Sequence, residues 1–295
     1  MKKHTFYIVD VFAEEKYAGN QLAVVREAAS LSGEQMQQIT KEMNYSETTF
    51  ILGEEPREGG YDVRIFTPGA EVPFAGHPTL GTAYIIQKEI MKEPVNEVFL
   101  NLKVGQIPVT FQDTGEGEEI LWMKQIEPVF GKVFDIVDIA NVLGIGKEDI
   151  DERFPIQEVS TGMPFIIVPL KSLDAVKRAK VNKDEYFKFI ENVSSKVILV
   201  FCPQTYHKHN DLNVRVFCDY YGIPEDPATG SGNGCLAGYL LGNRYFGTSD
   251  IDVCVEQGYE IGRPSLLYLK AQDKDGKIDV NVGGKVVMVA KGKLV

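Results

Sequence analysis

The amino-acid sequence predicts an α+β protein made of two similar domains. The main observation is a repeat, because "RIFTPGAEVPFAGHPTLGTAYII" at 64–86 and "RVFCDYYGIPEDPATGSGNGCLAGYLL" at 215–241 share one plan. Both stretches begin with arginine, a β-branched residue and phenylalanine, pass through a loop to a glycine turn, and continue as an apolar run. A second pair, "GNQL" at 19–22 and "GMPF" at 162–165, matches at a similar spacing. Self-similarity at a fixed spacing indicates a duplicated structural plan.

In the first half, hydrophobic patterning predicts strands interrupted by two helices. The first two strands are rich in valine, isoleucine and aromatic residues, and Gly19-Asn20 provides the turn between them. Ser32 can cap the first helix, and Pro78 suits the first turn of the second, where a missing N–H group costs nothing. The predicted helices are 31–44 and 79–90, and strands are expected within 6–12, 22–25, 46–52, 61–67, 97–112 and 118–130.

The second half repeats the order strand, turn, strand, helix, strand, loop, strand, glycine turn, helix. Helices are expected at 135–151 with a break at Gly144–Gly146, at 173–193, and at 234–243; strands are expected within 154–170, 196–203, 211–218 and after Ile251. The predicted domains are 1–127, completed by a strand at about 281–295, and 128–280. Two such domains facing each other would enclose a cleft.

Composition and charge exclude several classes of partner. A formal net charge of −11 argues against nucleic acid, because phosphate backbones bind basic surfaces, but a local pocket can still hold a small anion. We expect no membrane helix, since no stretch approaches roughly 18 apolar residues, and no secretory signal at the start of the sequence. The cysteines form no C-x-x-C pair and are expected to be reduced thiols of a cytoplasmic protein; they are Cys202, Cys218, Cys235 and Cys254.

The two glycine turns predict anion-binding positions. Each turn opens a helix, whose first N–H groups lack partners inside the helix and carry a partial positive charge. Gly76, Gly230 and Ser231 carry little or no side-chain bulk, so a carboxylate can approach the backbone there. A single turn of this kind is most simply structural, but a duplicated pair favours a ligand. His77 lies beside Gly76, and a helix start favours its neutral imidazole form.

Two acidic residues stand out from their surroundings. Glu47 enters an apolar strand, where desolvation would suit a carboxyl group that takes up and returns protons; a solvated strand edge is the simpler alternative. Asp226 precedes a proline in the loop of the second half that is equivalent to the loop before His77. A metal site at His207 and His209 is possible, although the polar composition around them favours an ordinary surface loop.

At "SETTF", "TPGAEVPFAGHPTLGTAY" and "DPATGSGNG" the sequence resembles the PhzF family of phenazine-biosynthesis-like isomerases. "GNQLAVV" and "MKQIEPVF" are similar to further blocks of that family, so the resemblance spans nearly the whole chain. It implies a diaminopimelate-epimerase-like fold, in which each of two similar domains is a curled, mostly antiparallel, barrel-like sheet around a central helix. The active site of such a fold lies between the two domains.

The resemblance also implies roles for particular residues. Glu47 matches the catalytic acid/base of the family, and His77 and Asp226 match two further catalytic residues. Gly76, Gly230 and Ser231 match positions that contact the substrate. The implied reaction moves a proton on a small anionic substrate without a cofactor or a metal, and the implied assembly is a homodimer.

We therefore expect an isomerase that shifts a proton on a small cyclic or unsaturated carboxylic acid. A non-catalytic carboxylate-binding protein that keeps the same fold is the alternative. The two-cysteine mechanism of related epimerases and racemases needs one thiol from each domain. The sequence has no cysteine before Cys202, so this mechanism is rejected.

Overall fold

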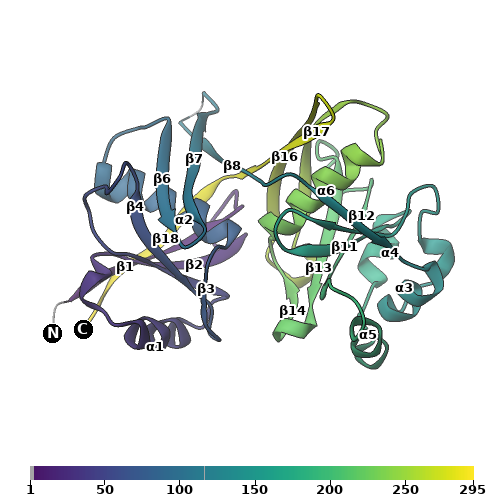
Figure 1. Cartoon of the computed structure of the whole chain (residues 1–295), viewed down its shortest axis with the longest axis horizontal. Helices are drawn as coiled ribbons and strands as arrows, with labels where there is room; N and C mark the ends of the chain where they lie inside the picture. Colours follow the sequence, from purple (N-terminus) through teal and green to yellow (C-terminus); the bar gives the residue numbers. More distant parts are fainter. Residues whose placement is uncertain (1–2, 116) are drawn as a thin grey trace. The chain divides into compact units, whose positions relative to one another are not determined.

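The computed structural model describes residues 3–115 and 117–295, and the chain divides into two compact units. Unit 1 consists of the residues up to Met123 together with Gly283–Val295, and unit 2 consists of Lys124–Val282. Strands dominate each unit, and the helices are few (Figure 1). No helix within the described ranges is long and apolar enough to span a membrane.

Unit 1 is a curled sheet with one buried helix. Its helices are α1 (Gly33–Met43), α2 (Gly76–Ile85), the π-helical turn η2 (Ile86–Met91) and the 3₁₀ turn η1 (Ala28–Ser30). Its strands are β1 (His4–Val11), β2 (Asn20–Val25), β3 (Glu47–Ile51), β4 (Tyr61–Phe66), β5 (Glu71–Val72), β6 (Glu97–Leu102), β7 (Gly105–Asp113), β8 (Glu119–Lys124) and β18 (Val286–Leu294).

Unit 2 has the same kind of sheet and more surface helices. Its helices are α3 (Ile136–Leu143), α4 (Leu173–Arg178), α5 (Lys183–Ile190), α6 (Gly230–Gly242), and the 3₁₀ turns η3 (Lys147–Asp149), η4 (Asp219–Tyr221) and η5 (Tyr259–Ile261). Its strands are β9 (Val129–Val133), β10 (Gln157–Ser160), β11 (Pro164–Pro169), β12 (Val197–Cys202), β13 (Leu212–Cys218), β14 (Ile223–Asp226), β15 (Asp250–Gln257), β16 (Ser265–Lys274) and β17 (Lys277–Gly284).

The two units share one pattern of strand pairing. In unit 1, β2 pairs antiparallel with β1 and parallel with β3, and β4 pairs antiparallel with β3 and β5 and parallel with β6. In unit 2, β11 pairs antiparallel with β10 and parallel with β12, and β13 pairs antiparallel with β12 and β14 and parallel with β15. The repeat in the sequence therefore has a structural counterpart, strand by strand.

The central helices are α2 in unit 1 and α6 in unit 2. Helix α2 packs against β1 and β2, and α6 packs against β10, β11 and β16. Both helices are apolar on nearly all sides, as expected of helices enclosed by a sheet. They begin earlier than predicted, at Gly76 instead of residue 79 and at Gly230 instead of residue 234. Glycine and proline are tolerated in a first turn because its N–H groups have no partner inside the helix.

Several local predictions about helix ends are confirmed. Ser32 caps α1 in a reciprocal arrangement with Gln35. Helix α3 ends at Gly144, whose φ of 61° lies in the left-handed region that glycine adopts without strain. Helix α6 ends at Gly242 and is followed by Asn243, as predicted.

Candidate functional site

In unit 1 the start of β3 faces the start of α2. Glu47 is the first residue of β3, and His77 is the second residue of α2. Nε2 of His77 lies 3.4 Å from Oε2 of Glu47, and the two side chains are 8% and 18% exposed. Two of the three residues predicted to be catalytic are therefore neighbours, in a place that is largely shielded from water.

The His77 ring is held in its neutral form. Burial lowers the pKa of His77 to about 3, and a hydrogen bond with the backbone of Gln21 only partly opposes this effect. Nε2 has no hydrogen bond among the described residues, so the bond to Gln21 engages Nδ1. Because this bond favours the protonated ring, Gln21 contributes its carbonyl as acceptor, and Nδ1 carries the proton. Nε2 is then an acceptor that points at the carboxyl group of Glu47.

This buried imidazole predicts an acid-sensitive contribution to stability. The folded-state pKa, near 3, lies below the unfolded value of about 6.5. Between these values the unfolded state binds more protons, so the free energy of unfolding falls as pH falls, by at most about 1.4 kcal/mol per pH unit. Urea unfolding of the wild type and of His77→Gln at pH 7, 6 and 5 should show a smaller slope in the variant. Parallel slopes would contradict the buried neutral ring, and His207→Gln, at an exposed histidine, is the control.

Helix α2 lies very close to the sheet beneath this pair. A Cβ atom on Gly81 would come within 2.6 Å of Cδ2 of Leu22, so any larger residue would force this buried side chain to move. Leu22 is also the residue that pairs with Glu47 in parallel register. The close packing of α2 on β2 therefore sets the distance between Glu47 and the helix start. Gly76, a predicted substrate contact, is the first residue of α2, and Ala75 before it provides no side-chain cap.

In unit 2 the other predicted residues lie together at the start of α6. Asp226 ends β14, Gly230 begins α6, and Ser231 follows it. Thr229, the residue before the helix, does not cap the helix with its side chain. Its hydroxyl group instead donates to Oδ2 of Asp226. The carboxylate of Asp226 is thus fixed beside the first turn of the helix.

An arginine–glutamate pair braces the loop before each central helix. In unit 1, Nε and Nη2 of Arg64 each donate to Glu71 over 2.8 Å. In unit 2, Nε and Nη2 of Arg215 donate to Glu225 over 3.0 and 2.7 Å. Each guanidinium also lies over the ring of the phenylalanine two residues later. The two arginines that revealed the repeat therefore hold the short strands β5 and β14, from which the chain continues to α2 and α6.

The two units differ at the position of the acid. Leu22 lies opposite Glu47 in unit 1, and Phe165 lies opposite Val197 at the equivalent place in unit 2. Val197 is fully buried. Where unit 1 carries a carboxyl group beside a histidine, unit 2 thus carries an apolar side chain. At this position, therefore, only unit 1 carries a carboxyl group beside an imidazole ring.

The histidines of the polar loop lie elsewhere in unit 2. The rings of His207 and His209 are 5.7 Å apart, and both residues are exposed. Within the described part of the chain, no group of three or more His, Cys, Asp or Glu side chains could hold a metal ion. Fully buried Glu256 organises this loop by accepting hydrogen bonds from the backbone N–H groups of Tyr206 and His207. The loop is therefore a surface loop that is held in place by hydrogen bonds to Glu256.

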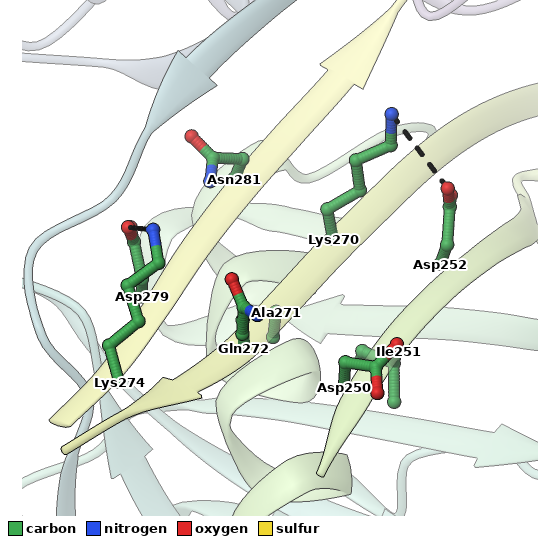
Figure 2. A pocket seen from close by; sticks show the side chains of 9 residues that line it. All are labelled: Asp250, Ile251, Asp252, Lys270, Ala271, Gln272, Lys274, Asp279 and Asn281. Atoms are coloured by element: carbon green, nitrogen blue, oxygen red, sulfur yellow. Dashed lines mark hydrogen bonds and ion pairs between the residues drawn. The ribbon is translucent and has the colours of Figure 1, made fainter. Parts of the chain in front are cut away.

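A polar surface pocket of about 330 Å³ lies on strands β15, β16 and β17 of unit 2 (Figure 2). Both lysines of its lining pair with an acidic side chain: Nζ of Lys270 is 3.8 Å from Asp252, and Nζ of Lys274 is 2.7 Å from Asp279. The residues that line it include none of those predicted to act on a substrate. We assign it no role in the chemistry.

The comparison with protein families shows to which family the chain belongs. The family model described as phenazine biosynthesis-like protein, PhzC-PhzF, matches residues 9–292. The chain belongs to the PhzF family. A trans-2,3-dihydro-3-hydroxyanthranilate isomerase of Pseudomonas aeruginosa is 32% identical over 98% of this chain and 99% of its own length. An uncharacterized isomerase of Clostridium acetobutylicum is 31% identical over 100% of this chain and 99% of its own length.

Solved structures agree with this assignment to the PhzF family. The phenazine biosynthesis protein of the PhzF family from Bacillus anthracis aligns over 100% of both chains, with a TM-score of 0.90 and 29% identity. A probable proline racemase of Agrobacterium radiobacter aligns over 99% of this chain and 93% of its own, with a TM-score of 0.63 and 9% identity, which shows a shared fold only. The predicted family, fold class and enzyme class, an isomerase, are confirmed.

Sequence reasoning missed some residues that shape this PhzF site. Gln21 holds the ring of His77 with a backbone group, which no side-chain pattern can reveal. Thr229 was part of a recognised motif, but its bond to Asp226 was not predicted. Gln257 is a third such residue, a buried amide at the end of a strand. Its strand, DIDVCVEQ, carries three acidic residues as well, so no sequence signal distinguished Gln257.

Proposed function

We propose that this protein is an isomerase that shifts a proton on a small cyclic or unsaturated carboxylic acid, with Glu47 as the general acid/base. The observation that carries the proposal is the 3.4 Å approach of Glu47 to a neutral, buried His77. A carboxyl group in such a place can take a proton from one carbon and return it to another. The named isomerase relatives, among them one that acts on trans-2,3-dihydro-3-hydroxyanthranilate, support the substrate class.

The proposed reaction balances without a cofactor. The Glu47 carboxylate removes a proton from a carbon next to the conjugated system, and the electron pair of the C–H bond moves into that system. The resulting carboxyl group then gives the same proton to a different carbon, and the electrons return to a localised double bond. One residue acts first as base and then as acid, so the product is an isomer of the substrate.

His77 would assist by accepting a hydrogen bond. An unprotonated Nε2 facing Oε2 repels a carboxylate and attracts a carboxyl group, because only the protonated oxygen can donate to it. The proton taken from the substrate therefore stays on Glu47, hydrogen-bonded to His77, until it is given to the second carbon. The fixed geometry of the ring, through its bond to Gln21, means that no reorganisation is needed when the proton arrives.

Gly76, Gly230 and Ser231 are proposed to contact the substrate, and unit 2 is proposed to bind its anionic part. Gly230 and Ser231 offer the N–H groups of a helix start, which favour a carboxylate, and Asp226 offers an acceptor for a polar substrate group. We also propose a homodimer, as the family resemblance implies. A cytoplasmic location is proposed because the four cysteines are free thiols.

Exchange of hydrogen with solvent tests the proposed reaction. The purified protein would be incubated in D2O with cyclic and unsaturated carboxylic acids, including trans-2,3-dihydro-3-hydroxyanthranilate. Mass spectrometry and NMR should show deuterium at the two exchanging carbons or a shifted double bond. Binding of a panel member without exchange would instead support the non-catalytic carboxylate-binding alternative.

A further inference from the structure

A fully buried glutamine connects the end of β15 with the start of α6. Nε2 of Gln257 donates to the carbonyl oxygen of Asp226 over 2.8 Å and to Oγ1 of Thr229 over 3.0 Å. Oε1 accepts from the backbone N–H of Thr229 over 3.2 Å and from Nδ2 of Asn233 over 2.8 Å. Both N–H groups of the amide and both lone pairs of its oxygen are thus in use.

These bonds fix the direction of a chain of hydrogen bonds that ends on Asp226. A backbone carbonyl can only accept, so the bond to the Asp226 carbonyl identifies which amide atom of Gln257 is the nitrogen. That nitrogen also donates to the Thr229 hydroxyl group, which leaves the hydroxyl hydrogen to point at Oδ2 of Asp226. The orientation of Gln257 therefore sets the direction of the hydrogen bond that Thr229 donates to Asp226.

The equivalent positions in unit 1 are apolar. Val72 of β5 lies opposite Ile65, as Asp226 of β14 lies opposite Val216, so Val72 is the counterpart of Asp226. Strand β6 pairs Asn101 with Asp62. The residue after Asn101 is a leucine, at position 102.

This leucine is the counterpart of Gln257. Val63 and Val214 precede Arg64 and Arg215, and Val214 pairs with Gln257. Continuing the register of β6 by one residue pairs Val63 with Leu102. An amide costs more to bury than a leucine unless it is fully hydrogen-bonded. Asp226 and Gln257 of unit 2 are therefore polar where the equivalent residues of unit 1 are apolar. This difference lies where the proposed substrate-binding helix begins.

We propose that Gln257 is a positioning residue that holds Asp226 and the first turn of α6 in the geometry that binds substrate. The inference rests on the proposed function, because it assigns substrate binding to this turn. Gln257 itself is fully buried behind the turn and acts through Thr229 and Asp226.

The test replaces Gln257 with leucine, the residue type of unit 1. We expect KM for an exchanging substrate to rise about 10- to 100-fold, as for losses of other orienting partners, while kcat changes less than about 3-fold because Glu47 and His77 are untouched. Gln87→Leu is the matched control, since Gln87 is an equally buried glutamine at the far end of the α2–η2 segment. A merely structural loss would lower the amount of active protein and leave KM unchanged, which would overturn the proposal.

A second variant and a second readout cover the other outcomes. If Gln257→Leu fails to fold, Gln257→Met keeps the length of the side chain and should show the same rise in KM. Hydrogen–deuterium exchange of the peptide backbone over 226–233 needs no substrate, and it should be faster in the variant than in the wild type and in Gln87→Leu. Unchanged protection of this segment would overturn the proposal even if no panel member is turned over. If the wild type turned over no panel member but the Gln257 variant still lost protection over 226–233, only the proposed substrates would be contradicted.

Discussion

Replacing Glu47 by glutamine is expected to lower deuterium incorporation into a substrate by about 10³-fold or more, because the amide can neither accept nor return the proton. The substitution keeps the size of the side chain and its place at the start of β3. The measurement is the initial rate of exchange in D2O, followed by mass spectrometry. Binding should be retained, because the proposed anion contacts at Gly230 and Ser231 do not involve the Glu47 side chain.

Two further variants make this result specific. Glu42→Gln makes the same chemical change at an exposed position of unit 1 and should exchange like the wild type. Glu47→Asp withdraws the carboxyl group by one methylene and should give an intermediate rate. If Glu47→Gln exchanged at the rate of Glu42→Gln, Glu47 would not be the acid/base, and the proposed reaction would lose its central residue.

Removal of the Arg215 side chain should cause the largest loss of stability among the substitutions considered. The Arg215 and Glu225 side chains are 10% and 8% exposed, and Nη1 of Arg215 also donates to the carbonyl oxygens of Val176 and Ala179. Arg215→Ala therefore leaves a buried carboxylate without its partner. We expect the free energy of unfolding to fall by about 3–5 kcal/mol, measured by urea unfolding at pH 7.

The equivalent arginine–glutamate pair of unit 1 provides the control for this prediction. Arg64 is 31% exposed, and its partner Glu71 also pairs with Lys103 over 2.7 Å. These two cations hold the pKa of Glu71 down, to about 2. Since Lys103 remains in Arg64→Ala, that variant should lose much less stability, about 1 kcal/mol. Equal losses in Arg64→Ala and Arg215→Ala would contradict the role given to burial of the Arg215 pair.

The fold was largely predictable because its elements follow local rules. Ser32 and Gly144 mark helix ends through their own side chain or backbone freedom, so their sequence signals are sufficient. Strands β5 and β14 were not predicted, because strands of two and four residues have no hydrophobic period and depend on Glu71 and Glu225 being held by arginines on neighbouring strands. The starts of α2 and α6 were placed too late, since their first turns consist of glycine, proline and small polar residues.

The candidate site was less predictable because it depends on tertiary contacts. The strand pattern around Glu47 is equally compatible with a solvated edge, and only the family motif distinguished the two possibilities. Its neighbour His77 lies 30 positions away in the sequence and meets it because α2 crosses close to β2 at Gly81. Gln257 could not be assigned a role from its sequence context, because its partners are 24–31 positions away and include backbone groups.

The pairing of β1 with β18 has a consequence for how the protein is made. These strands run antiparallel from His4 opposite Leu294 to Val11 opposite Val286, so unit 1 is assembled from segments on both sides of unit 2. During translation unit 2 is complete once Val282 has left the ribosome, whereas the edge of β1 that does not pair with β2 stays open until β18 is made. Contacts of such long sequence separation form slowly. Nascent unit 1 therefore exposes an unpaired strand edge, a target for chaperones, throughout the synthesis of unit 2.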